Sequence, residues 1–329
     1  MSLLDTPFTK QLGIAYPIIC GPMYPSSNPE LVAAVSEAGG IGIVQPLSLV
    51  YVHGYELRAG LKKIKALTSK PFGMNIIVEQ SSRLYEKRMR EAIQIALEEG
   101  CRFFITSLGN PQWVVETVKP FGGIIYHDVT SKRWAEKAIK HHVDGLICVN
   151  NRAGGHAGAL SMEALYQELK EFKLPLVCAG GIGDENDFIH ALKMGYAAVQ
   201  MGTRFIASKE SLESEDYKQA ILKATERDIV LTERVTGIPL SVIRTPYVDK
   251  VGTHISPLAR ILFKYRLTKR WMRLWYGWRA VRQFKKSALH GGASSDYWQA
   301  GKSVHHIQEI EPAAAIIKRF AEFVRKNSE

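Results

Sequence analysis

Between Tyr16 and about Thr225, short apolar runs alternate with longer stretches that mix apolar and charged residues. The apolar runs are continuous, which is typical of strands buried on both faces of a parallel sheet. The predicted strands are 17–20, 41–44, 72–77, 102–106, 123–126, 144–149, 174–178 and 197–201. Helical patterns lie between them, as in 29–38, 84–99, 131–141 and 185–194. Several of these predicted helices end on glycine, the usual C-terminal residue of a helix.

Eight strand–helix units in succession favour an α/β fold of the closed (β/α)8 TIM barrel type over an open doubly wound sheet. The remaining residues predict additions to this barrel. We expect a barrel over 1–243, a basic, Trp-rich helical cap or insert over 244–296, and a C-terminal segment, 297–329, whose helix packs back on the barrel.

The loops that follow the predicted strands carry the candidate chemistry, because barrel enzymes place their active sites there. After the sixth strand, the loop Asn150–Gly158 surrounds His156 with three glycines. Glycine lets backbone approach a ligand closely, and histidine changes charge near neutral pH. Glycines also follow the seventh strand (Gly180, Gly181) and the eighth (Gly202, next to Thr203). Loops seven and eight commonly bind phosphate in such barrels, so we expect an anion there.

The order of several motifs resembles the nitronate monooxygenase family, which includes FMN-dependent enoyl-acyl-carrier reductases and NADH:quinone reductases. The matching stretches are 17–23 (PIICGPM), 33–42 (AAVSEAGGIG), 71–75 (PFGMN), 153–156 (AGGH), 179–182 (AGGI), 200–205 (QMGTRF) and 298–301 (WQAG).

The resemblance implies an FMN cofactor and assigns roles to the loop residues. It makes His156 the catalytic acid/base, which takes the proton alpha to a nitro group while the flavin takes the electrons. Met23 would lie along the flavin ring, where a thioether suits an aromatic face. The implied FMN-binding set is Gly21, Pro22, Met23, Asn75, Asn150, Gly154, Gly180, Gly181, Gln200, Met201, Gly202 and Thr203.

The implied reaction is oxidation of an alkyl nitronate or nitroalkane with O2. Two alternatives remain open: an NAD(P)H-dependent enoyl-thioester or quinone reductase, and a membrane-associated flavin-binding protein without turnover.

The residues just before the histidine motif depart from the family pattern. Where relatives often carry Gln-Gly-x-Glu, this chain has Val149-Asn150-Asn151-Arg152. We expect Asn150 or Asn151 to replace the lost polar contact. We also expect the Arg152 cation to lower the pKa of His156 and to favour anionic substrates.

The other histidines give weaker signals. His127 and Asp128 stand together at a strand end, which fits either a charged pair in the site or a structural hydrogen bond. The pairs 141–142 and 305–306 fit solvated residues, and no spacing predicts a metal site.

The net charge of +11 is local to one segment. Residues 250–295 hold eleven Lys or Arg and no Asp or Glu, and the remaining 32 basic residues balance the 32 acidic ones. Within it, 257–286 reads as helix, with a break expected near 267–270. Two apolar stripes at helical spacing lie in this segment: Leu258, Ile261, Leu262 and Tyr265, then Trp271, Leu274, Trp275, Trp278 and Val281.

Three interpretations of the basic segment remain open. The first is a cap that buries both stripes against the barrel mouth. The second is contact with an anionic membrane surface, because Trp, Leu and basic residues suit lipid headgroups. The third is an acidic acyl carrier or an acyl-CoA. Nucleic acid is disfavoured because no recognised binding motif accompanies the charge.

Cysteine spacing and the N-terminus predict a reducing, cytoplasmic location. The four cysteines form no CxxC pair, and no basic-then-apolar leader or apolar run of about 20 residues is present. The sequence does not indicate an oligomeric state.

Overall fold

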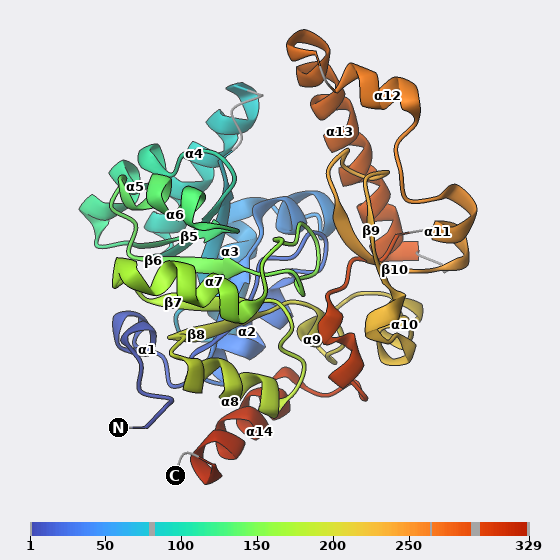
Figure 1. The fold of residues 1–329 in the computed structure, drawn as a ribbon. Helices are drawn as coiled ribbons and strands as arrows, with labels where there is room; N and C mark the ends of the chain where they lie inside the picture. The colour runs from blue at the N-terminus through green and yellow to red at the C-terminus, as the bar shows by residue number, and fades with distance from the viewer. Residues whose placement is uncertain (1, 79–82, 264, 291–296, 328–329) are drawn as a thin grey trace.

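A computed structural model describes residues 2–78, 83–263, 265–290 and 297–327 (Figure 1). Eight parallel strands form a closed barrel in chain order, and β1 pairs with β8 to close it, with Ile18 opposite Val199. The strands are β1 Ile18–Cys20, β2 Ile41–Val44, β3 Gly73–Ile77, β4 Phe103–Ser107, β5 Ile124–Val129, β6 Gly145–Val149, β7 Leu176–Ala179 and β8 Ala198–Met201. The predicted (β/α)8 barrel is confirmed, and each predicted strand overlaps an observed one.

Helices connect the strands and cover the outside of the barrel. The barrel-associated helices are α1 Pro7–Leu12, α2 Pro29–Glu37, α3 Leu57–Leu67, α4 Arg83–Glu98, α5 Gln112–Val118, α6 Lys132–Ile139, α7 Met162–Leu169, α8 Glu185–Met194, α9 Thr203–Ile206, α10 Glu215–Lys223 and α14 Ala313–Lys326. Short helical turns are η1 Ser48–Val52, η2 Lys119–Phe121, η3 Lys170–Phe172, η4 Glu226–Asp228 and η5 Lys302–His306. The cap contains β9 Ile229–Thr232, β10 Leu240–Ile243, α11 Pro246–Val251, α12 Pro257–Leu262 and α13 Arg266–His290.

Aromatic residues fill the amino-terminal end of the barrel. Phe8 of α1 packs edge-on against Phe103 and Tyr126, with ring centroids 5.8 and 5.5 Å apart. Because Phe103 begins β4, this contact places α1 at the bottom of the barrel. The opposite end, where the strands finish, remains for the functional loops.

The cap has its own small hydrophobic core. The antiparallel hairpin β9–β10 packs with α11 and α13 through Leu240, Val242, Val248, Ala280 and Phe284. The C-terminal helix α14 packs on the barrel instead, where the ring centroids of Phe320 and of Phe188 in α8 are 5.7 Å apart. The hairpin therefore belongs with the cap in packing terms.

The cap does not bury both apolar stripes, which was one of the three interpretations of this segment. Helix α12 ends at Leu262 and helix α13 begins at Arg266, just before the helix break expected at 267–270. The buried face of α13 carries Tyr276, Ala280, Phe284 and Ser287. Both stripes have exposed members, which are Ile261 and Tyr265 in the first and Trp271, Leu274, Trp275 and Trp278 in the second. Helical spacing identifies residues that share a face, but the hairpin determines which face it covers.

Figure 1 shows α12 and the first part of α13 projecting away from the barrel. No helix in the described part of the chain is both long and apolar enough to span a bilayer.

Candidate functional site

A cavity of about 560 Å³ opens where the barrel strands end, and we call it the flavin cavity. Its lining includes His156 and all but one of the residues predicted to bind the cofactor. The predicted residues that line it are Gly21, Pro22, Met23, Asn75, Gly154, Gly180, Gly181, Gln200, Met201, Gly202 and Thr203. The exception, Asn150, lies outside the lining.

The glycines after β7 and β8 form a cradle that larger residues would fill. Gly180 and Gly181 have φ angles of 116° and 83°, a region that favours glycine. A methyl group on Gly180 would lie 2.4 Å from Asn150 Oδ1, and one on Gly202 would lie 3.3 Å from Met23 Sδ. Such a backbone cradle suits a phosphate group, since amide N–H groups can approach it closely.

Thr203 and Asn150 fix this cradle from two sides. Thr203 Oγ1 accepts a hydrogen bond from Gly301 N at 3.0 Å and can donate its own proton to an anion. Asn150 is fully buried; its Nδ2 donates to Gly180 O at 2.9 Å and its Oδ1 accepts from Arg152 N at 2.8 Å. The Asn150 side chain therefore shapes the loop from behind the cavity wall.

Two buried amides lie in the rest of the lining. Gln200 Oε1 is buried and has no hydrogen-bond partner within the described part of the protein. Asn75 Nδ2 donates to Ile105 O at 3.1 Å, which fixes the orientation of that side chain. Because a buried unpaired acceptor is costly, Gln200 favours a ligand that donates a hydrogen bond. A flavin ring carries such an N–H group, so the lining fits FMN.

His156 faces the cavity from the loop after β6. Its Nε2 lies 3.2 Å from Thr236 Oγ1, whose hydroxyl in turn donates to Ile238 O at 2.9 Å. Because the Thr236 proton is used at Ile238, Nε2–H acts as the donor to Thr236 and Nδ1 is left unprotonated. Burial by the surrounding protein lowers the pKa of His156 below its usual range. The shift favours the neutral imidazole, which is the form that can accept a proton.

The cap holds the histidine loop in position. Ser241 N of β10 donates to Gly155 O at 2.8 Å, and Thr236 lies between the two hairpin strands. On the other side, a methyl group on Gly154 would lie 2.9 Å from Gly301 N. The base is therefore fixed by residues distant in sequence.

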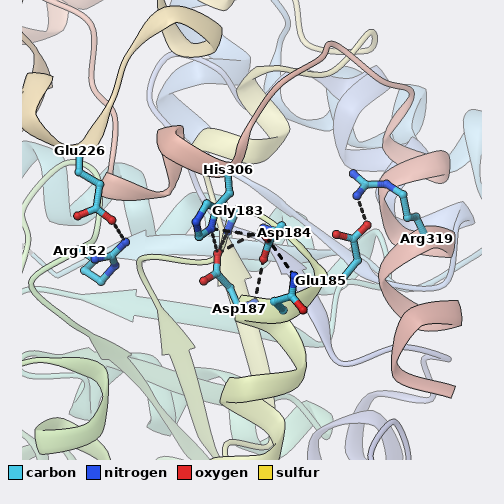
Figure 2. A network of polar contacts seen from close by, with 9 residues as sticks. Arg152, Gly183, Asp184, Glu185, Asp187, Glu226, His306 and Arg319 are labelled. Atoms are coloured by element: carbon cyan, nitrogen blue, oxygen red, sulfur yellow. Dashed lines mark hydrogen bonds and ion pairs between the residues drawn. The ribbon is translucent and has the colours of Figure 1, made fainter. Parts of the chain in front are cut away.

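Arg152 does not act as expected on His156. Burial alone lowers the pKa of His156, with no contribution from Arg152. Instead the Arg152 side chain runs over Gly181, where a methyl group would lie 2.8 Å from its Nε, and its guanidinium pairs with Glu226 (Figure 2). The positive charge thus lies beside the predicted phosphate cradle.

Burial also shifts the pKa values of a second histidine and of two carboxyl groups in the lining. Burial lowers the pKa of His127 to about 4 and raises the pKa of Asp128 and of Glu213 to about 7. His127 hydrogen bonds to Thr106 Oγ1 at 2.8 Å, whereas Asp128 Oδ1 is buried without a partner in the described structure. The structural hydrogen bond, one of the two interpretations of His127, is the one observed.

A polar network lies just after the cradle residues in sequence, at the start of α8, and Figure 2 shows its members. Asp184 and Asp187 cap the amino end of α8, and His306 Nδ1 donates to Asp187 at 2.8 Å. Burial opposes the charged ring, but the bond to Asp187 raises the pKa of His306 above its usual range. His306 is thus a partly buried structural residue rather than a solvated one. The three side chains are close enough to hold a metal ion, yet their polar atoms already serve as helix cap and hydrogen-bond partners.

Several cap residues in the lining were not predicted from the sequence. Phe284 and Ser287 of α13 line the flavin cavity, as does Tyr297. Gln299 lines it too and lay within the WQAG stretch that resembles the family. Phe284 could not be identified because its position depends on how the cap folds onto the barrel.

Comparisons with known proteins agree with this geometry. The family model "Nitronate monooxygenase" matches residues 5–322. A "Probable nitronate monooxygenase" of Staphylococcus saprophyticus is 28% identical, covering 95% of this chain and 96% of the relative. A Mycobacterium tuberculosis protein named "(3aS,4S,5R,7aS)-5-hydroxy-7a-methyl-1-oxo-octahydro-1H-indene-4-carboxyl-CoA dehydrogenase" is 30% identical, covering 75% of this chain and 68% of the relative.

Solved structures share the whole architecture. FabK from Thermotoga maritima superposes with a TM-score of 0.81 at 29% identity, covering 98% of this chain and 97% of that one. The structure of nitroalkane oxidase from Streptomyces ansochromogenes has a TM-score of 0.77 at 21% identity, covering 97% and 98%, and shares the fold. The family match and the cavity lead to one conclusion: the chain belongs to the nitronate monooxygenase family and is an FMN-dependent oxidoreductase.

Proposed function

We propose that the protein oxidises alkyl nitronates or nitroalkanes with O2, with His156 as the base. The observation that carries this proposal is a neutral imidazole that faces the same cavity as the glycine cradle. A neutral base is what removal of a proton alpha to a nitro group requires. The resulting nitronate is then the species that loses electrons.

The protein residues would act on the proton and on the cofactor's position. His156 Nδ1 receives the proton as the C–H bond breaks, and Thr236 holds the ring through Nε2–H. FMN in the cavity would accept the electrons of the substrate and pass them to O2. Gly180, Gly181 and Thr203 would bind its phosphate, with Arg152 supplying a nearby positive charge.

The remaining cofactor contacts are also part of the proposal. Met23 would pack along the ring and Gln200 Oε1 would accept a flavin N–H hydrogen bond. Asn150 would act indirectly, through the Gly180 carbonyl that it binds.

A reductase that uses NAD(P)H on an enoyl thioester or a quinone is the second candidate. Two findings favour it: a relative named for a carboxyl-CoA substrate, and the likeness to FabK over nearly the whole chain. The same flavin cavity would serve, with a nicotinamide as electron donor.

Anaerobic flavin reduction separates these candidates and the third, a membrane-associated flavin protein without turnover. The purified protein is expected to show a flavin spectrum that bleaches on mixing with an alkyl nitronate. Bleaching by NADH or NADPH alone would replace the first proposal with the reductase. A flavin that neither reagent reduces would leave binding without turnover.

We further propose that the exposed face of α13 meets an anionic membrane surface. Trp271, Trp275 and Trp278 are 75%, 50% and 56% exposed. The Arg282 Cζ atom lies 3.9 Å from the centroid of the Trp278 ring. Tryptophan beside basic residues suits the headgroup region, and an acidic lipid surface complements a segment without acidic residues. A second copy of the chain would bring like charges together at this face.

Co-sedimentation with phosphatidylglycerol vesicles tests this surface. Binding is expected at low salt, with a clear loss for Trp271→Ala and none for Phe121→Ala, an exposed aromatic outside the cap. Lack of binding to vesicles together with binding to an acidic acyl carrier protein would assign the face to that partner instead.

The cysteines support a reducing, cytoplasmic location as a final part of the proposal. Cys20, Cys101, Cys148 and Cys178 are all buried free thiols. Fractionation that places the protein in an oxidising compartment would contradict it.

A further inference from the structure

A second cavity of about 490 Å³ lies within the cap, and we call it the basic cap cavity. Its lining comes from the residues after β9, from α11 and from α13: Arg234, Tyr247, Val251, Arg279, Arg282, Gln283, Lys286 and Tyr297. Half of these side chains carry a positive charge, and none of the lining residues is Asp or Glu. Such a lining attracts anions.

Two guanidinium groups lie together in this cavity without a carboxylate. Arg279 Nη2 donates to Arg234 O, and Arg234 Nη2 donates to Val251 O. The Nε atoms of both arginines are buried and have no hydrogen-bond partner in the described residues. A partly buried pair of like charges is unfavourable unless an anion compensates it.

Elsewhere this chain does compensate its buried arginines. Arg204, only 1% exposed, lies 3.6 Å from Glu311, and Arg319 pairs with both Glu185 and Glu311. No such ion pair involves Arg234 or Arg279 within the residues that the structure describes. The Arg279 guanidinium lies 5.0 Å from the ring centroids of Trp275 and Tyr276, so a carboxylate is still missing from the described structure and a ligand anion would compensate the charge.

Tyr297 lines both cavities, which places them side by side. The helix α13 also serves both: Phe284 and Ser287 face the flavin cavity, whereas Gln283 and Lys286 face the basic one. A single ligand lying across Tyr297 would place an anionic end among the arginines and its other end near the flavin.

We propose that the basic cap cavity binds the phosphate-bearing tail of a small molecule whose other end reacts in the flavin cavity. Diphosphate and phosphate esters match several cations at once, and Arg binds their oxygens through paired N–H groups. Coenzyme A thioesters and reduced nicotinamide dinucleotides share this chemistry. For the reaction at the flavin, the inference rests on the second proposed function, the reductase; the binding itself needs no turnover.

Calorimetric titration of the FMN-loaded protein with inorganic pyrophosphate tests the cavity. Saturable binding is expected, weakened at least about fivefold by Lys286→Gln and by Arg282→Gln, because each removes a charged hydrogen-bond donor. Lys285→Gln is the matched control: it removes the same charge from the neighbouring residue of α13, which does not line the cavity. An equal loss for Lys285→Gln, or no saturable binding to the wild type, would overturn the proposal.

Competition identifies the source of the phosphate. Displacement of pyrophosphate by coenzyme A, NADH or NADPH supports the proposal and indicates which tail fits. Displacement only by phosphatidylglycerol vesicles would assign the cavity to a lipid headgroup and overturn the small-molecule tail. If pyrophosphate and a nucleotide bind but nitronates fail to reduce the flavin, only the proposed oxidation fails.

Discussion

The flavin cavity and the basic cap cavity share Tyr297 but treat their polar groups in opposite ways. In the flavin cavity, burial keeps the titratable groups close to neutral: the pKa of His127 falls to about 4 and that of Asp128 rises to about 7. In the basic cap cavity, the charged lining residues are three arginines and a lysine, and no lining residue is Asp or Glu. Histidine and carboxyl groups that can gain or lose a proton suit proton transfer. A cluster of positively charged side chains suits binding of an anion.

The largest expected effect comes from removing the base of the flavin cavity. His156→Asn should retain the flavin spectrum but lose turnover of neutral nitroalkanes by about 10²–10⁴-fold, the usual contribution of a general base. Pre-formed nitronates need no deprotonation and should retain most of their rate. Steady-state assays with both substrates check this, and an equal loss on both would show that His156 does more than remove a proton.

Asp128→Asn tests whether the carboxyl is held neutral. Its folded pKa of about 7 lies above the unfolded value of about 3.9, so its contribution to stability is full below about pH 4 and is lost as the pH rises to about 7. The variant should therefore match the wild type at low pH and exceed it above about pH 7, by on the order of 4 kcal/mol at most. Denaturant unfolding across this range measures the difference.

The exposed carboxyl Asp216 provides the control for that measurement. Asp216→Asn should show no comparable gain with pH. If the unfolding free energy of Asp128→Asn depends on pH as that of the wild type does, the Asp128 carboxylate of the wild type is already hydrated in the cavity.

Arg152 adds a positive charge to the lining of the flavin cavity, whereas the basic cap cavity contains several such charges. Arg152→Gln should weaken FMN about tenfold, because a charge-assisted contact near the phosphate is lost. Riboflavin lacks the phosphate, so its affinity should be unchanged. Flavin fluorescence titration measures both, and Arg244→Gln, which removes an exposed ion pair with Asp249, is the control. Equal losses for FMN and riboflavin would place Arg152 against the ring instead.

The smallest expected effect concerns the helix that contributes to both cavities. Gly277 lies in the middle of α13 with no atom within 4 Å of an added methyl group, so Gly277→Ala should stabilise the protein by up to about 1 kcal/mol. Gly252 has equally open space but a φ of 74°, so Gly252→Ala should destabilise instead. Thermal unfolding of the two variants checks the opposite signs, and a loss for both would mean that α13 needs to bend at Gly277.

The sequence predicted the barrel because its buried strands are continuous apolar runs, which local pattern alone identifies. It also placed the glycine loops and His156 at the mouth, since chain order in a barrel determines which loops meet there. The role of Arg152 differed from the prediction: burial lowers the pKa of His156, and the Arg152 guanidinium pairs with Glu226, a residue far along the chain. The position of Asn150 behind the cavity wall could not be predicted either, since it depends on contacts with Gly180 O, Arg152 N and Cys178 Sγ.

The cap was the least predictable region. The helical period correctly grouped Trp271, Trp275 and Trp278 on one face, but no local rule states whether a hairpin covers that face. The contribution of Phe284 to the flavin cavity and the clustering of Arg234 with Arg279 both depend on that docking.

The hydrogen bonds that join Thr236 and Ser241 to the histidine loop have a consequence for how this family can diversify. The reactive ring sits on the barrel, but its orientation is set by the hairpin, so the two cannot be exchanged independently. A chimera that joins this barrel to another member's cap would inherit a different tilt of the imidazole as well as a different entrance. New substrates acquired by replacing the cap would therefore require a compensating change beside His156.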